Sequence, residues 1–72
     1  MKITKIKTEF ITLGQFLKIE NFINSGGEAK FYLREKDIYI NDELDVRRGR
    51  KLYPNDIVKI DQINYRIVKN EN

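Results

Sequence analysis

The 72-residue sequence contains no cysteine and no histidine, and it has only one proline and four glycines. Without cysteine, neither a disulfide nor a thiolate metal site can stabilise the fold, so stability must come from packing and local conformational preference. Without histidine, the chain lacks the commonest general base at neutral pH and the commonest zinc ligand. These two absences argue against an enzyme and against a zinc protein, and nothing indicates an oxidising compartment.

The sequence also lacks other features of enzymes, metal sites and membrane proteins. Ser25 is the only serine and has no histidine partner, so nucleophilic catalysis is not expected. The acidic residues of segment 37–45 have no EF-hand spacing, and strand alternation would point Asp42 and Asp45 in different directions. Residues 1–8 alternate lysine with isoleucine and threonine and contain no run resembling a signal peptide or a membrane span. We expect a cytoplasmic protein without catalytic residues, metal, cofactor, small-molecule substrate or membrane association.

A chain of this length, 40% hydrophobic, fits one small folded domain. We expect residues 1–72 to form a single domain with its core at about 10–68 and a frayed tail at 69–72. Such a small body rarely holds a catalytic cleft, and we expect it to be a monomer.

The β-branched residues and lysines of segment 2–8 indicate an edge strand or an ordered arm guarded by charge. After this segment, apolar spacing predicts two short helices. Thr12 and Gln15 form a capping box that opens a helix over 13–20. Ser25 and Glu28 form a second capping box, which predicts a second helix from Ser25 onward.

From residue 37 the apolar period changes from helical to two, which predicts strands. Segment 37–46 is interpreted as a hairpin turning at Asn41 and Asp42, and the strands at 57–61 and 65–68 as a further pair. Between these units lies a Pro54–Asn55–Asp56 turn in which Asn55 can take the left-handed conformation. The order of elements predicts an α+β domain.

The densest charge in the chain is the segment "RRGRK", which places Arg47, Arg48, Arg50 and Lys51 around Gly49. Four neighbouring cations repel one another, an arrangement typical of a segment that binds a polyanion. Glycine would let this loop approach a phosphate backbone closely. The alternative is a solvated loop that only supports solubility.

The second helix carries a further basic flank, with Lys30 and Arg34 one turn apart on the side opposite Ala29 and Leu33, and Phe31 beside them. Two cations at this spacing weaken a helix slightly, so helix propensity does not explain them. An aromatic ring next to two cations suits stacking on an unpaired base. The alternative is that Phe31 packs beneath the amino-terminal strand.

With these residues in place, the chain from about Thr12 to Val68 resembles an S4 RNA-binding domain, most closely the small stand-alone bacterial S4 proteins of the YaaA type. The resemblance rests on "TLGQFLK", "SGGEAK", "IYINDEL", "RRGRKLYPND" and "IVKI". It implies a two-helix S4 (alpha-L) motif packed on a small antiparallel sheet and docked on structured RNA, usually ribosomal or transfer RNA. It also implies that the RNA face comprises Ser25, Gly26, Gly27, Lys30 and Arg34, flanked by Arg48, Arg50 and Lys51.

The chain departs from the S4 pattern at four positions. Gly26 stands where many relatives have arginine, so backbone N–H groups would replace one side-chain contact to phosphate. Lys36, Asp42 and Asn55 stand where the family often has glycine. Aspartate and asparagine tolerate the left-handed region, which leaves Lys36 as the least favourable replacement.

The sequence therefore predicts a non-enzymatic protein that binds structured RNA through a basic helix face and loop. The S4 resemblance implies that this RNA is ribosomal and is bound during ribosome assembly. One alternative is a protein-interaction module in which Phe31 and the basic loop bind an acidic partner. Another is a nonspecific DNA binder, which would bind duplex DNA and structured RNA equally well.

Overall fold

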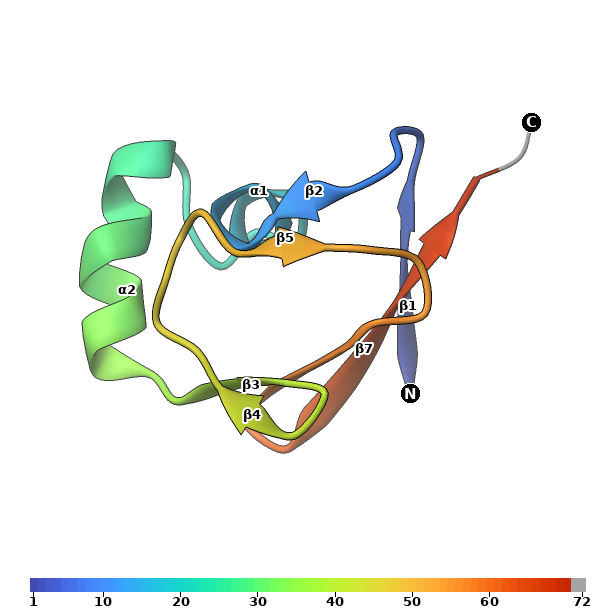
Figure 1. The fold of residues 1–72 in the computed structure, drawn as a ribbon. Helices are drawn as coiled ribbons and strands as arrows, with labels where there is room; N and C mark the ends of the chain where they lie inside the picture. The colour runs from blue at the N-terminus through green and yellow to red at the C-terminus, as the bar shows by residue number, and fades with distance from the viewer. Residues whose placement is uncertain (71–72) are drawn as a thin grey trace.

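Two α-helices and two sheets make up residues 1–70, the part of the chain that this computed structural model describes (Figure 1). The strands are β1 (Lys2–Ile6), β2 (Ile11–Thr12), β3 (Ile38–Ile40), β4 (Glu43–Leu44), β5 (Lys51–Leu52), β6 (Ile57–Ile60) and β7 (Ile63–Lys69). The helices are α1 (Leu13–Ile19) and α2 (Ala29–Glu35), with a 3-10 turn, Gly26–Glu28, leading into α2. The predicted α+β class is confirmed. No helix in this part of the chain has the length and apolar character needed to cross a bilayer.

The main sheet has the strand order β1-β7-β6-β3-β4, and β2 pairs separately with β5. Within the main sheet, the pairs β7–β6, β6–β3 and β3–β4 are antiparallel. Strand β1 runs parallel to β7, with Ile3 opposite Arg66. The sheet is thus mixed, not wholly antiparallel as predicted. Parallel pairing requires a long crossover, and the intervening helices and strands supply it. The predicted edge position of the first strand is confirmed.

The core begins earlier, and the ordered chain continues further toward the carboxyl end, than the sequence predicted. Thr4 and Ile6 of β1 are buried, so the core begins before residue 10. Lys69 closes β7, and the Asn70 amide donates a 2.7 Å hydrogen bond to the Ile6 carbonyl, so these two residues are not frayed. Residues 71 and 72 of the predicted tail lie outside the described residues.

Helix α1 covers the inner face of the main sheet, because its apolar residues recur at helical spacing. Leu13, Phe16 and Leu17 are fully buried. From the sheet, alternate residues point into the same core, as the period of two requires. They are Ile38, Ile40, Val58, Ile60, Tyr65 and Ile67. Helix α2 lies at the end of the molecule away from β1 and β7 (Figure 1), and it buries only Ala29 and Leu33.

The two helix starts differ from each other. At α1 both halves of the predicted capping box form: Gln15 N donates to Thr12 Oγ1 at 3.2 Å and Thr12 N donates to Gln15 Oε1 at 2.8 Å. The capping box predicted at Ser25 is wrong, because the Ser25 side chain makes no capping bond. Two glycines with poor helix propensity follow Ser25, and the chain takes a tighter 3-10 turn there before α2 begins.

Left-handed residues close the hairpins. Asn41 (φ 51°) and Asp42 (φ 71°) form the predicted β3–β4 turn, and both positive angles match the twist of a two-residue hairpin. Asn55 is left-handed as predicted, at φ 79°. The β6–β7 turn lies at residues 61–62, slightly earlier than predicted. Lys36 is extended at φ −120°, so its replacement of glycine introduces no strain.

Candidate nucleic-acid interface

The basic loop, residues 47–51, is held against the start of α1 by backbone hydrogen bonds. Leu13 N donates to the Arg50 carbonyl and Gly14 N to the Arg48 carbonyl, both at 2.8 Å. Amides in the first turn of a helix have no intrahelical acceptor, so the loop supplies their partners. A Cβ added at Gly14 would lie 3.4 Å from the Arg48 carbonyl oxygen. The contact of Gly14 with the basic loop was not predicted from the sequence. Glycine is a poor helix former, so its place in the first turn of a predicted helix was a signal of such a contact.

The basic loop and α2 together line an open surface hollow of about 470 Å³. Its charged lining residues are Lys30, Arg34 and Arg48, and Leu33 and Val46 form its apolar floor. No aspartate or glutamate is among these lining residues. Two segments that the sequence predicted separately as basic therefore meet, and their positive charges face one space.

Phe31 lies on the solvent-exposed side of α2, as the helical spacing predicted. Its side chain is 62% exposed, and its ring centroid lies 6.0 Å from the Arg34 guanidinium carbon. The alternative that Phe31 packs beneath the amino-terminal strand is therefore wrong. Residues 29 and 33 face the core, and a residue two positions from each must point away from it.

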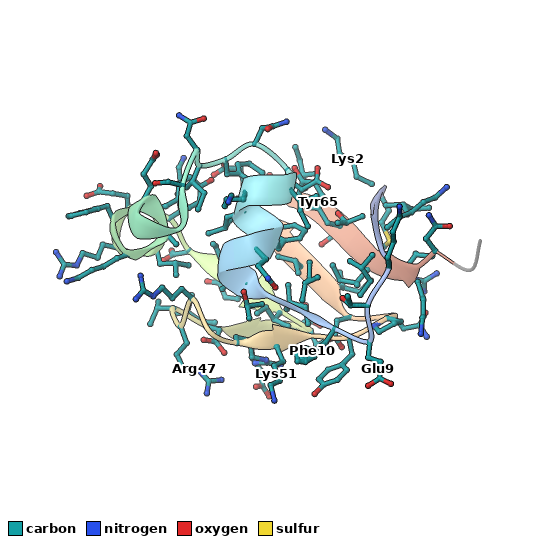
Figure 2. The ribbon with its side chains drawn as sticks, turned by 90° about the horizontal axis from the view of Figure 1, so that it is seen from above. Lys2, Glu9, Phe10, Arg47, Lys51 and Tyr65 are labelled. Atoms are coloured by element: carbon teal, nitrogen blue, oxygen red, sulfur yellow. The ribbon has the colours of Figure 1, made fainter. Side chains whose placement is uncertain are left out.

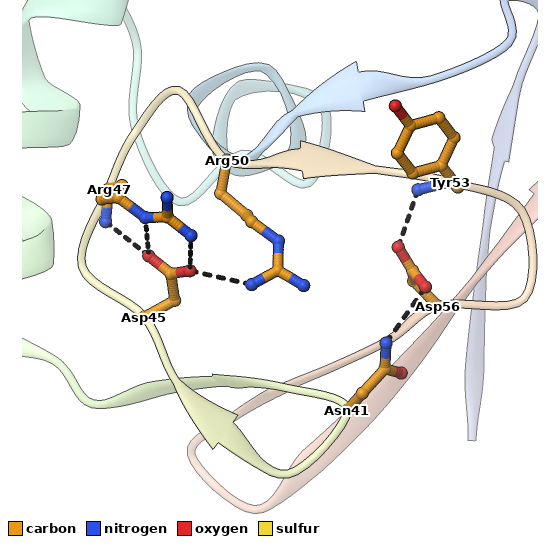
Figure 3. A network of polar contacts seen from close by, with 6 residues as sticks. All are labelled: Asn41, Asp45, Arg47, Arg50, Tyr53 and Asp56. Carbon is orange, nitrogen blue, oxygen red and sulfur yellow. Dashed lines mark hydrogen bonds and ion pairs between the residues drawn. The ribbon is translucent and has the colours of Figure 1, made fainter.

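Two of the four cations of the basic loop have an internal partner. Asp45, only 7% exposed, accepts hydrogen bonds from Arg47 Nε at 3.1 Å, Arg47 Nη2 at 2.8 Å and Arg50 Nη1 at 2.9 Å (Figure 3). The Arg47 backbone N–H donates a further bond at 2.9 Å. The hydrogen bonds from the Arg47 side chain lower the pKa of the Asp45 carboxyl strongly, against the opposing effect of burial. The expected repulsion among the four cations is therefore partly offset, and the sequence did not reveal Asp45 as the partner of two of them.

Further hollows continue the basic surface to either side of Gly49. One, of about 400 Å³, brings Gly26 together with Lys18, Arg48 and Gly49. Another, of about 440 Å³, is lined by Arg47, Gly49, Arg50, Lys51, Tyr53 and Asp56. Each hollow shares Arg48 or Gly49 with its neighbour, so the three form one continuous surface, called here the basic face. Figure 2 shows Arg47 and Lys51 on the same side of the molecule.

The remaining predicted residues lie at one margin of the basic face. Ser25 and Gly27 are exposed next to Gly26 in the turn that leads into α2. Glu28 N in this turn is already bonded to the Ser25 carbonyl at 3.1 Å, so it is not free for a phosphate. Within residues 1–70, no three acidic side chains gather in a way that could hold a metal ion.

Comparison with known proteins identifies the same fold family that the sequence motifs indicated. Residues 4–68 match the family described as "S4 domain". The chain is also 59% identical over 56 residues to the "Probable ribosome maturation protein RlbA" of Bacillus subtilis (strain 168). That alignment covers 78% of this chain and 79% of the relative. The predicted resemblance is thereby confirmed.

Proposed function

Since the chain belongs to the S4 family of RNA-binding domains, we propose that it is a non-enzymatic protein that binds structured RNA through its basic face. The observation that carries this proposal is the hollow in which Lys30, Arg34 and Arg48 meet without a carboxylate in its lining. A phosphate there would gain from all three charges and would meet no repelling group among the lining residues. Arginine can also hold two phosphate oxygens at once through its planar guanidinium group.

The rigidity of the basic loop supports the same proposal. Hydrogen bonds to Asp45 hold the side chains of Arg47 and Arg50. Hydrogen bonds from the first amides of α1 hold the loop backbone. A loop that is already ordered loses less conformational entropy on binding. Arg48 is exposed and lines two of the hollows, so it is the cation of this loop best placed for a phosphate.

The RNA that we propose is ribosomal RNA, bound by a monomer in the cytoplasm during ribosome assembly. Support comes from the Bacillus subtilis relative, which is named as a probable ribosome maturation protein. Crosslinking in the source cell, followed by sequencing of the attached RNA, tests the proposal. We expect reads concentrated at one region of ribosomal RNA, and reads spread over messenger RNAs, or no recovered RNA, would contradict it.

Gly26→Arg should strengthen RNA binding. An added Cβ at Gly26 meets nothing within 4 Å, and Gly26 lines a hollow together with Arg48, so the new side chain can reach the basic face without strain. One further phosphate contact should steepen the slope of log K against log salt by about 0.7 to 0.9. Salt titrations of binding to an RNA hairpin measure this slope. The control Gly26→Gln adds length without charge, and an equal gain with glutamine would contradict the charge argument.

Phe31→Ala should leave folding unchanged and weaken binding to RNA with unpaired bases. An exposed side chain of this kind changes the free energy of unfolding by no more than about 0.5 kcal/mol. Loss of a stacked base should cost about 1 kcal/mol or more, roughly fivefold in affinity. Binding of a looped hairpin is compared with binding of a blunt duplex. If both RNAs lost affinity equally, Phe31 would contribute something other than stacking.

Exposed apolar side chains beside the same cations favour a second candidate, a module that binds an acidic protein. Phe31 and Val46 are 62% and 60% exposed, and Val46 lies in the floor of the hollow. Affinity for an acidic protein surface would also fall as salt rises, so ribonuclease treatment is the test that separates the two functions. A partner protein that stays bound after the RNA has been digested would support the second candidate.

A further inference from the structure

Two aromatic side chains meet on the surface at the end of the small β2–β5 sheet. Phe10 precedes β2 and Tyr53 follows β5, and their ring centroids are 5.7 Å apart at an interplanar angle of 54°. The pairing of Ile11 with Leu52 continues by one step to bring these two positions opposite each other. Tyr53 is 49% exposed, and Phe10 is only partly buried. Neither ring belongs to the buried core.

Cations of the basic loop surround this ring pair. Lys51 Nζ lies 4.9 Å from the centroid of the Phe10 ring, within the range of a cation–π contact. Tyr53 also lines the hollow that contains Arg47, Arg50 and Lys51. Figure 2 shows Phe10 and Lys51 next to each other on the side of the molecule that carries Arg47. An aromatic surface is therefore continuous with the basic face.

The backbone beneath Tyr53 is fixed. Asp56 Oδ2 accepts a 2.8 Å hydrogen bond from Tyr53 N, and Asp56 Oδ1 accepts one from Asn41 Nδ2 at 3.0 Å (Figure 3). Asn55, left-handed, completes the turn and donates its N–H to the Ile67 carbonyl at 2.7 Å. The tyrosine ring is thus presented from a rigid turn, and a ligand would need to order little of the protein.

We infer that Tyr53, supported by its contact with Phe10, forms a stacking site for an unpaired nucleotide, whose phosphates Lys51 and Arg50 in the adjoining hollow would hold. This inference rests on the proposed function and extends it, because it assigns a base-binding site outside the S4 helices. Aromatic rings stack on every base with little dependence on sequence, and neighbouring cations hold the backbone. Asp56 and Glu9 lie near the site, so the phosphates must approach from the basic loop.

An unpaired nucleotide fits this surface better than a protein partner does. The exposed aromatic area is confined to two rings, whereas a stable protein interface buries about 800 Å² on each side. Lys51 lies over the Phe10 ring, and Lys51 and Arg50 line the same hollow as Tyr53, so cations are at hand for the phosphate backbone of a nucleotide stacked on Tyr53. Together with the hollow beside α2, the stacking site predicts an RNA that has a paired part and an adjoining single strand.

Tyr53→Leu tests the inference on two RNA hairpins with the same stem, one blunt and one with a single-stranded uridine tail. We expect the native protein to bind the tailed hairpin more tightly. The leucine variant should lose about five- to tenfold in affinity for the tailed hairpin and less than about twofold for the blunt one. Tyr53→Phe keeps the ring and should behave like the native protein.

Tyr39→Leu is the matched control, because Tyr39 is an exposed tyrosine of β3 that pairs with Lys59 and lines none of the three hollows of the basic face. It should leave both affinities unchanged. The inference would be overturned if Tyr53→Leu bound both hairpins as tightly as the native protein does. It would also be overturned if Tyr53→Phe lost as much affinity for the tailed hairpin as Tyr53→Leu. If the native protein bound neither hairpin in a salt-dependent way, the proposed function itself would fail.

Discussion

Replacing Lys30, Arg34 and Arg48 together with glutamine is expected to lower the affinity for structured RNA by roughly tenfold or more. These three side chains line one hollow without an opposing carboxylate in its lining. If each contributes about 0.5 kcal/mol, the middle of the range for exposed ion pairs, the total loss is about 1.5 kcal/mol. Loss of three phosphate contacts should also flatten the slope of log K against log salt by about 2 to 3. Fluorescence anisotropy at several salt concentrations measures both quantities.

The sheet provides a control of equal charge. Lys5, Lys59 and Arg66 are exposed at alternate positions of β1, β6 and β7, on the outer face of the main sheet. Replacing these three with glutamine changes the formal net charge by the same amount but leaves the basic face intact. We expect this variant to keep a salt slope close to that of the native protein. If both variants flattened the slope equally, binding would depend on net charge and not on the basic face.

Asp45→Asn is expected to lower the free energy of unfolding by about 1 to 3 kcal/mol at pH 7, because it removes charge-assisted bonds to Arg47 and Arg50. In a domain of this size, each 1 kcal/mol lowers the melting temperature by about 4 to 8 °C. Thermal unfolding followed by circular dichroism measures the loss. Asp37→Asn changes the charge equally at an exposed position and should cost less than about 0.5 kcal/mol. An equally stable Asp45→Asn protein would show that the ion pairs contribute no net stability.

The same carboxyl makes stability depend on pH in acid. Its pKa is lower in the folded protein than in the unfolded chain, chiefly because the Arg47 side chain hydrogen-bonds its charged form. The unfolded chain therefore takes up the proton first, and the stabilisation is complete above an ordinary aspartate pKa of about 4. It is lost progressively as the pH falls below 4 toward the folded pKa. Between about pH 4 and pH 2, native protein should lose stability more steeply than Asp45→Asn, and parallel curves would contradict this.

Local patterns in the sequence predicted most of the elements correctly. The Thr12–Gln15 capping box, the Asn41–Asp42 turn and the outward position of Phe31 each depend on residues within one turn of helix or one hairpin. Short-range chemistry determines such features, so spacing alone can locate them. Ser25 is the exception, because two flexible glycines after it let the chain begin with a tighter turn.

Features that depend on contacts across the chain could not be predicted in this way. Strands β2 and β5 have two residues each, too few for a periodic signal, and the parallel register of β1 on β7 joins opposite ends of the sequence. The partner of Arg47 and Arg50 was missed for a different reason, because the period of two placed Asp45 within a predicted hairpin strand, whereas β4 ends at Leu44. The structure brings the predicted α2 cations and Arg48 to one hollow. In the loop, the sequence did not reveal that Asp45 and Gly14 fix the geometry.

The parallel pairing of β1 with β7 has a consequence for synthesis on the ribosome. Lys2 lies opposite Tyr65, so the first strand must wait for about 60 more residues to emerge before its neighbour exists. Contacts that join such distant segments form late and slow folding. Until β7 has emerged, Thr4 and Ile6 have no neighbouring strand to pack beside, and the nascent chain is open to proteases and to aggregation. Closure of the main sheet should therefore be a late step of folding, after β7 has left the ribosome.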